Sequence, residues 1–185
     1  MVVAPERPGA VRTALEVPRW AVGFYRRHLL LVVGISAIPA AQRFIAQRWA
    51  AQLPAVAGVA GELVTGAARL ALVAVVVRLA ILADERLRRL PADDAWRRVR
   101  RFARARWPSL AVQGLLLATA VLVFDVVPER VVARWVPADA EATYWAVLLG
   151  VKNLTVIPLT MIWWVGTVRQ MLLHAPAEAD RGMPA

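Results

Sequence analysis

Four long apolar runs, separated by arginine-rich segments, limit the possible folds of this 185-residue chain more than any other feature of its sequence. Hydrophobic residues make up 59% of the sequence, against roughly 45–50% in a soluble domain. The formal net charge is nevertheless +10. Both properties fit one chain if membrane spans alternate with cationic loops. We therefore predict an all-α integral membrane protein, a four-transmembrane-helix bundle with a cytoplasmic amphipathic interfacial helix.

The predicted membrane domain covers residues 28–168, with spans at about 28–45, 63–83, 108–125 and 144–168. Its first span is the weakest, because the uncharged run 29–42 gives only about 21 Å of helix against a hydrocarbon core of about 30 Å. A re-entrant segment, or a signal peptide that begins at Arg26 and Arg27, remains an alternative for this run. Residues 1–27 are expected to form a basic arm in which Pro5, Pro8 and Pro18 interrupt any long helix.

The distribution of arginine predicts the orientation of the chain. Residues 1–27, the loop 84–107 and the tail 169–185 hold five, nine and two arginines, whereas the two intervening loops hold two each. Because cytoplasmic loops are enriched in basic residues, both termini and the middle loop should be cytoplasmic. A single lysine beside many arginines, with abundant Ala and Val, is typical of a GC-rich bacterium. We expect the chain in a bacterial cytoplasmic membrane.

The middle loop contains a strongly amphipathic segment, which should form a helix with Asp93 as its N-cap. One face of this helix is apolar and carries Trp96 and Phe102, and the opposite face carries Arg97, Arg98, Arg100, Arg101 and Arg104. This pattern indicates a helix in the inner interface, with its rings toward acyl chains and its guanidinium groups among anionic headgroups. Its simplest role is a topology anchor, and a docking surface for a cytoplasmic partner is the alternative. Nucleic acid is not an expected partner.

Polar residues inside the predicted spans are candidate functional residues, because ionisable groups are costly in a bilayer. Four of them should lie at matching depth toward the outer side: Arg69, Asp125, Lys152 and Asn153. Glu62 belongs to the same candidate cluster, because it is seven residues before Arg69 and shares a face of the second span with it. They could form a packing network. They could alternatively line an outward-facing pocket in which Arg69 and Lys152 bind an anionic group, with Pro158 loosening the fourth helix.

The sequence carries no catalytic motif that we can identify. Cysteine is absent, His28 and His174 are far apart, and neither a phosphate-binding loop nor a G-x-S-x-G motif occurs. We expect no cofactor or metal. Small residues, among them Gly58, Gly61, Gly66, Gly114 and Ala118, offer faces where a helix can approach closely.

These features favour a non-catalytic subunit or self-assembling component of a membrane complex. Its expected partners are anionic lipid headgroups and a second copy or another membrane protein. The alternatives are a permease-like transport subunit, which would use the outer polar pocket, and a lipid-modifying membrane enzyme.

Overall fold

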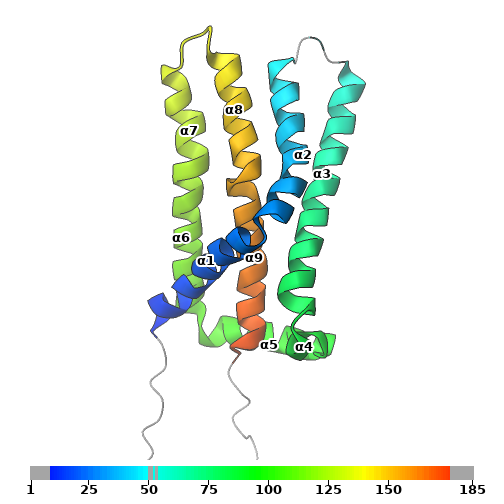
Figure 1. The fold of residues 1–185 in the computed structure, drawn as a ribbon. Helices are drawn as coiled ribbons and strands as arrows, with labels where there is room; N and C mark the ends of the chain where they lie inside the picture. Colours follow the sequence, from blue (N-terminus) through cyan, green and yellow to red (C-terminus); the bar gives the residue numbers. More distant parts are fainter. Residues whose placement is uncertain (1–8, 50–51, 53, 176–185) are drawn as a thin grey trace, which may run out of the picture.

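The computed structural model describes residues 9–49, 52 and 54–175, and within these ranges every regular element is a helix (Figure 1). Four helices are long and apolar enough to cross a membrane: Leu29–Arg48, Val56–Leu82, Trp107–Trp135 and Glu141–Leu173. They confirm the prediction of a helical multi-pass membrane protein. Residues 1–8 and 176–185, which belong to the predicted arm and tail, lie outside the described residues.

Helix α1 (Ala10–Arg27) lies obliquely across α6 and α9, and α2 (Leu29–Arg48) forms the first span (Figure 1). The expectation that Pro18 interrupts the arm is wrong, since Pro18 stands within an 18-residue helix. A proline costs one helical hydrogen bond. Packing of the apolar face of α1, which includes Ala14, Val17 and Phe24, against α6 and α9 offsets that cost. Helix α2 has 20 residues, or about 30 Å, so its length suffices to cross the core.

The second span combines α3 (Ala55–Val77) with a π-helical turn, η2 (Arg78–Leu82). Two short helices follow, α4 (Glu85–Arg88) and α5 (Ala92–Ala105). The prediction of Asp93 as N-cap is wrong, because Pro91 occupies that position and its carbonyl accepts from the Ala95 N–H at 2.9 Å. Asp93 lies instead in the first turn, where a carboxylate also favours the helix.

The third span is longer than the sequence suggested and runs through four consecutive elements. They are α6 (Trp107–Val121), the π-helical turn η3 (Leu122–Val126), α7 (Val127–Arg130) and the 3₁₀ turn η4 (Val132–Trp135). Pro128 does not end the span, since the backbone of Val126 and Val127 stays helical from η3 into α7.

The fourth span is broken at Thr155, between α8 (Glu141–Leu154) and α9 (Val156–Leu173). Pro158, which is buried, has no N–H to offer the Leu154 carbonyl four residues earlier. The Tyr25 hydroxyl donates to that carbonyl at 2.7 Å. A side chain of α1 therefore supplies a hydrogen bond that the proline removes from the fourth span.

The fourth span lies at the centre of the bundle. Helix α8 packs against α2, and α9 packs against α1, α3 and α5. The main apolar core includes Phe24, Val32, Val76 and Ile162 from α1, α2, α3 and α9. The first and last described residues lie at the end of the bundle that carries α4 and α5, which we call the α5 end (Figure 1). This placement agrees with an even number of spans.

Candidate functional site

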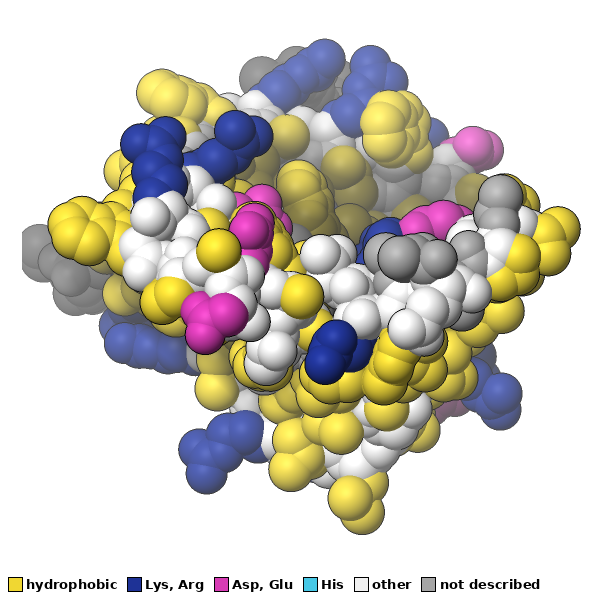
Figure 2. Space-filling model, turned by 90° about the horizontal axis from the view of Figure 1, so that it is seen from above, with side chains coloured by type: hydrophobic (Ala, Val, Ile, Leu, Met, Phe, Trp, Pro, Cys, Tyr) yellow, Lys and Arg dark blue, Asp and Glu magenta, His cyan; other side chains and the backbone are white. Residues whose placement is uncertain are grey.

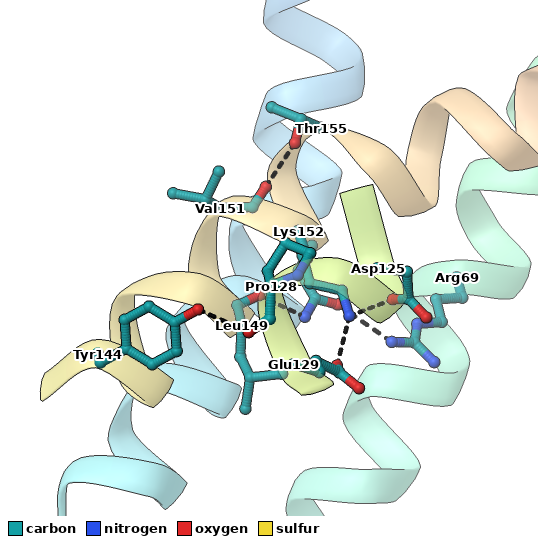
Figure 3. Close-up of polar contacts among 10 residues, drawn as sticks. Arg69, Asp125, Pro128, Glu129, Tyr144, Leu149, Val151, Lys152 and Thr155 are labelled. Atoms are coloured by element: carbon teal, nitrogen blue, oxygen red, sulfur yellow. Dashed lines mark hydrogen bonds and ion pairs between the residues drawn. The ribbon is translucent and has the colours of Figure 1, made fainter. Parts of the chain in front are cut away.

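Five polar side chains from three spans form what we call the Lys152 cluster: Arg69, Asp125, Glu129, Lys152 and Asn153 (Figure 3). Lys152, on the last turn of α8, is only 5% exposed. Its Nζ atom pairs with Asp125 of η3 and, at 2.5 Å, with Glu129 Oε1 of α7. Arg69 of α3 donates from Nη2 to Asn153 Oδ1 at 3.1 Å. The cluster thus joins the second and third spans to the fourth.

Local sequence positions these groups. Asp125 and Glu129 are four residues apart, so a helical third span presents both carboxylates to one neighbour. Lys152 lies near a helix C-terminus, where the helix dipole favours a cation. Asn153 fixes its own orientation by donating from Nδ2 to the Leu149 carbonyl at 2.8 Å. The side chains are therefore held by their own helices before they meet.

The cluster contains two cations and two carboxylates, so its formal charge is zero. Removing one partner from a buried ion pair is far more destabilising than replacing the whole pair, because the remaining charge is left in a low dielectric. The space beside Arg69 and Asn153 measures about 10 Å³, roughly the volume of one water probe. The geometry therefore leaves no room there for an anionic solute.

Glu62, which the sequence grouped with these residues, pairs elsewhere. Its carboxylate lies 2.7 Å from Arg43 of α2 and is 55% exposed. One turn further along, Thr65 donates to Gln42 at 3.2 Å. Gly61 permits this close approach, since a Cβ there would lie 2.5 Å from Gln42 Nε2. The polar residues of the second span thus face two different neighbours.

The sequence analysis did not identify Glu129 as part of the cluster or Arg43 as the partner of Glu62. The four-residue spacing from Asp125 could have indicated Glu129. No sequence signal assigns Arg43 to Glu62, because that pairing depends on how α2 and α3 meet.

Figure 2 views this end of the bundle, opposite the α5 end, and shows acidic and basic side chains interspersed among apolar ones.

A second polar layer, which the sequence did not indicate, lies toward the α5 end and joins α1, α6 and α9. Gln113 donates to Gln170 Oε1 at 2.7 Å, and Gln170 donates to the Thr13 carbonyl at 2.7 Å and to Glu16 at 3.1 Å. Both glutamines are almost fully buried. Thr167 adds a hydrogen bond to Gln113 at 3.2 Å. Such satisfied buried amides fix how three helices pack.

Arg169, assigned by sequence to the tail, lies within α9 and connects three elements. Its Nε donates to the Ala80 carbonyl at 3.0 Å, and its Nη2 lies 3.7 Å from Asp84. Its guanidinium also stacks over Trp20, 5.7 Å from the ring centroid. Trp20 lies against Gly166, where an added Cβ would be 2.6 Å from the ring. The missing side chain of Gly166 therefore makes room for Trp20.

Helix α5 packs against α6 and α9. Part of its apolar face therefore contacts protein, and part of it is exposed. Phe102 is fully buried, so the expectation that all its rings face lipid is wrong at this position. Arg98 donates to the Leu172 carbonyl at 3.2 Å. Trp96, by contrast, is 61% exposed, and Arg100 and Arg104 are also exposed.

At the start of α5, Arg97 pairs with Asp94. This hydrogen bond lowers the pKa of the Asp94 carboxyl below its usual value.

Comparison with protein-family models, curated proteins and solved structures gives no match. Within residues 9–49, 52 and 54–175, no group of three or more His, Asp or Glu side chains could hold a metal ion. The arrangement is one of ion pairs and hydrogen bonds that join helices.

Proposed function

We propose that the chain is a non-catalytic membrane subunit that assembles with a second copy or with another membrane protein. The observation that carries the proposal is the exposure of the third span. Only 6% of the residues in its most apolar stretch are buried, against 22 to 28% in the other three spans. Most of its surface is thus free to contact lipid or a partner.

The small-residue face of the third span supports assembly. Gly114 and Ala118 are both exposed, and a Cβ added at Gly114 would meet nothing within 4 Å. Small residues spaced four apart let transmembrane helices approach closely, and packing drives their association in lipid. This chain does not use the Gly114 position for close helix contact, which leaves it available to a partner span.

The polar contacts favour this proposal over transport. Lys152 pairs with two carboxylates, Arg69 pairs with Asn153, and the adjoining space measures about 10 Å³. A permease-like subunit needs a polar cavity that can take its solute. The Lys152 cluster is better suited to joining spans than to binding a transported anion.

Because the chain has no cysteine, single cysteines test the proposal cleanly. Ala118→Cys in native membranes should form an oxidative cross-link at twice the 20.3 kDa monomer mass if copies self-assemble. A thiol-reactive heterobifunctional cross-linker should instead give one discrete larger adduct if the partner is another protein. Leu70→Cys, on an exposed part of α3, is the matched control and should give neither product.

Gly114→Leu should reduce the cross-linking of Ala118→Cys by blocking close approach. An Ala118→Cys protein that stays monomeric under both reagents, while it unfolds at the normal temperature, would contradict assembly through this face.

We further propose that the α5 end faces the cytoplasm of a bacterium and that α5 lies among anionic headgroups. The exposed Trp96, Arg100 and Arg104 support this placement, since an interfacial helix carries rings at the headgroup level and cations among lipid phosphates. Reporter fusions after residues 53 and 135 should report the exterior, and one after residue 90 the cytoplasm. An exterior signal from residue 90 would reverse the orientation. Arg100→Glu with Arg104→Glu should lower anionic-lipid enrichment around the protein in nanodiscs.

A further inference from the structure

A groove opens sideways between the third and fourth spans. It is lined by apolar and small side chains that include Leu117, Ala120 and Phe124 on one side and Thr155, Leu159 and Trp163 on the other. Its volume is about 220 Å³. We call it the lateral groove.

Polar contacts join the third and fourth spans at two levels, and the groove lies between these two levels. Toward one end, Lys152 binds Asp125 and Glu129, and Tyr144 donates to the Pro128 carbonyl at 2.8 Å. Toward the α5 end, Gln113 binds Gln170. Residues 113 and 125 are about 18 Å apart along a helix, and the third and fourth spans do not pack closely over that distance.

The dimensions of the groove fit one hydrocarbon chain. Its lining on the third span covers residues 117–124, about 10 Å of helix, so 220 Å³ corresponds to a cross-section of about 20 Å². With carbon atoms in contact at about 3.5–4.0 Å, that width admits a single acyl chain. A partner helix, about 10–12 Å across, is too wide to enter.

Beyond the end of the groove next to Phe124, the exposed atoms of the Lys152 cluster are mostly carboxylate oxygens, although the cluster has no net formal charge. Lys152 is covered, with 7% of its side chain exposed, whereas Asp125 and Glu129 are 39% and 32% exposed. What a lipid headgroup meets is therefore carboxylate, which attracts an ammonium group.

Glu129 lies at a depth in the membrane that a lipid headgroup can reach. The third span has 29 residues, or about 43 Å, which exceeds the core of about 30 Å and extends beyond it. Glu129 is six residues before Trp135, so it lies about 9 Å from the end of the span, near the headgroup boundary.

We propose that the lateral groove binds one acyl chain of a phospholipid whose headgroup carries a primary amine, with the ammonium against Asp125 and Glu129. The lipid fills the space between two spans that are joined only above and below it. The binding does not depend on assembly of the chain, because Gly114 and Ala118 do not line the groove.

The test is native mass spectrometry of the full chain, reconstituted in vesicles with equimolar phosphatidylethanolamine and phosphatidylglycerol and then extracted. The wild-type protein should retain one phosphatidylethanolamine. Ala120→Phe fills the groove and should reduce retention about tenfold or more. Ala71→Phe makes the same change on the exposed surface of α3 and should leave retention unchanged. Glu129→Gln should lower the preference for phosphatidylethanolamine over phosphatidylglycerol at least about threefold.

Three results would overturn the proposal. Full retention by Ala120→Phe would exclude the groove as the binding site. Equal retention of phosphatidylglycerol by the wild type would exclude the amine contact. Loss of a dimer in Ala120→Phe, without loss of lipid, would identify a second copy as the occupant. If Ala120→Phe fails to fold, the test is the part of the tryptophan quenching by spin-labelled phosphatidylethanolamine that disappears when Trp163 is replaced in Trp163→Phe. If that part is no greater than with spin-labelled phosphatidylglycerol, the proposal is refuted.

Discussion

The hydrogen bond from Tyr25 to the Leu154 carbonyl should stabilise the fold because Pro158 leaves that carbonyl without a helical donor. Tyr25→Phe removes the hydroxyl and little else. In the Pro158→Ala background, residue 158 regains an N–H that can bond the Leu154 carbonyl along the helix. The cost of Tyr25→Phe should therefore depend on residue 158.

The magnitude follows from the 2.7 Å geometry and from the buried position of Pro158. A buried acceptor left without its donor costs about 1–3 kcal/mol, whereas hydrogen bonds measured inside membranes average about 0.6 and reach about 1.7 kcal/mol. We expect Tyr25→Phe to lower the free energy of unfolding by about 1.5 kcal/mol. In the Pro158→Ala background the loss should be under about 0.5 kcal/mol, which gives a coupling of about 1 kcal/mol.

Steric-trap unfolding in bicelles measures all four proteins of this double-mutant cycle. Tyr144→Phe is the control, because its hydroxyl bonds the Pro128 carbonyl at 2.8 Å and has no link to residue 158. Its cost should be the same in both backgrounds. Equal costs for Tyr25→Phe in the wild-type and the Pro158→Ala backgrounds would show that the Tyr25 hydroxyl does not replace the bond that Pro158 removes. A cost near zero in the wild-type protein would show the same.

Three further predictions concern other contacts. Gly166→Ala should push Trp20 out of place, cost about 1–3 kcal/mol of stability and speed amide exchange in α1; unchanged exchange would show that this contact does not hold α1. Lys152→Met should cost about 2 kcal/mol, less than the ~3–5 for a fully buried pair because both carboxylates are partly exposed, and Asp125→Asn with Glu129→Gln should restore part of the loss. Because Arg97 lowers the pKa of Asp94, the Asp94–Arg97 contact should persist above the usual carboxyl value of about 3.9 and be lost as pH falls through the lower folded value. Carboxyl NMR of the protein in nanodiscs should show this midpoint, and Arg97→Gln should raise it.

The apolar runs and the arginine-rich loop between them predicted the spans, since transfer into lipid depends on composition over about 20 residues. Their ends were less predictable. Pro18 was expected to interrupt the N-terminal arm, yet it lies within a helix that packs on α6 and α9. Burial of a helix face can offset a lost backbone hydrogen bond, and hydropathy alone does not report that burial.

The candidate site was partly predictable. Lys152, Asn153, Arg69 and Asp125 were singled out because charge in a bilayer is costly, and the structure brings these four together. Glu62 joins Arg43 instead. The layer around Gln113 and Gln170 went unnoticed because uncharged amides give little signal in a hydropathy profile.

Apolar helices long enough to cross a bilayer follow from the amino-acid sequence alone, because each residue's preference for lipid or water acts locally. Three features arise only when the helices pack together: Lys152 meets Asp125 and Glu129, Tyr25 reaches the Leu154 carbonyl, and a groove opens beside Ala120. Those features depend on which helix faces meet and at what height. Hydropathy carries no information about the rotation of a helix about its axis or its register against a neighbour when every span is apolar enough to cross the bilayer.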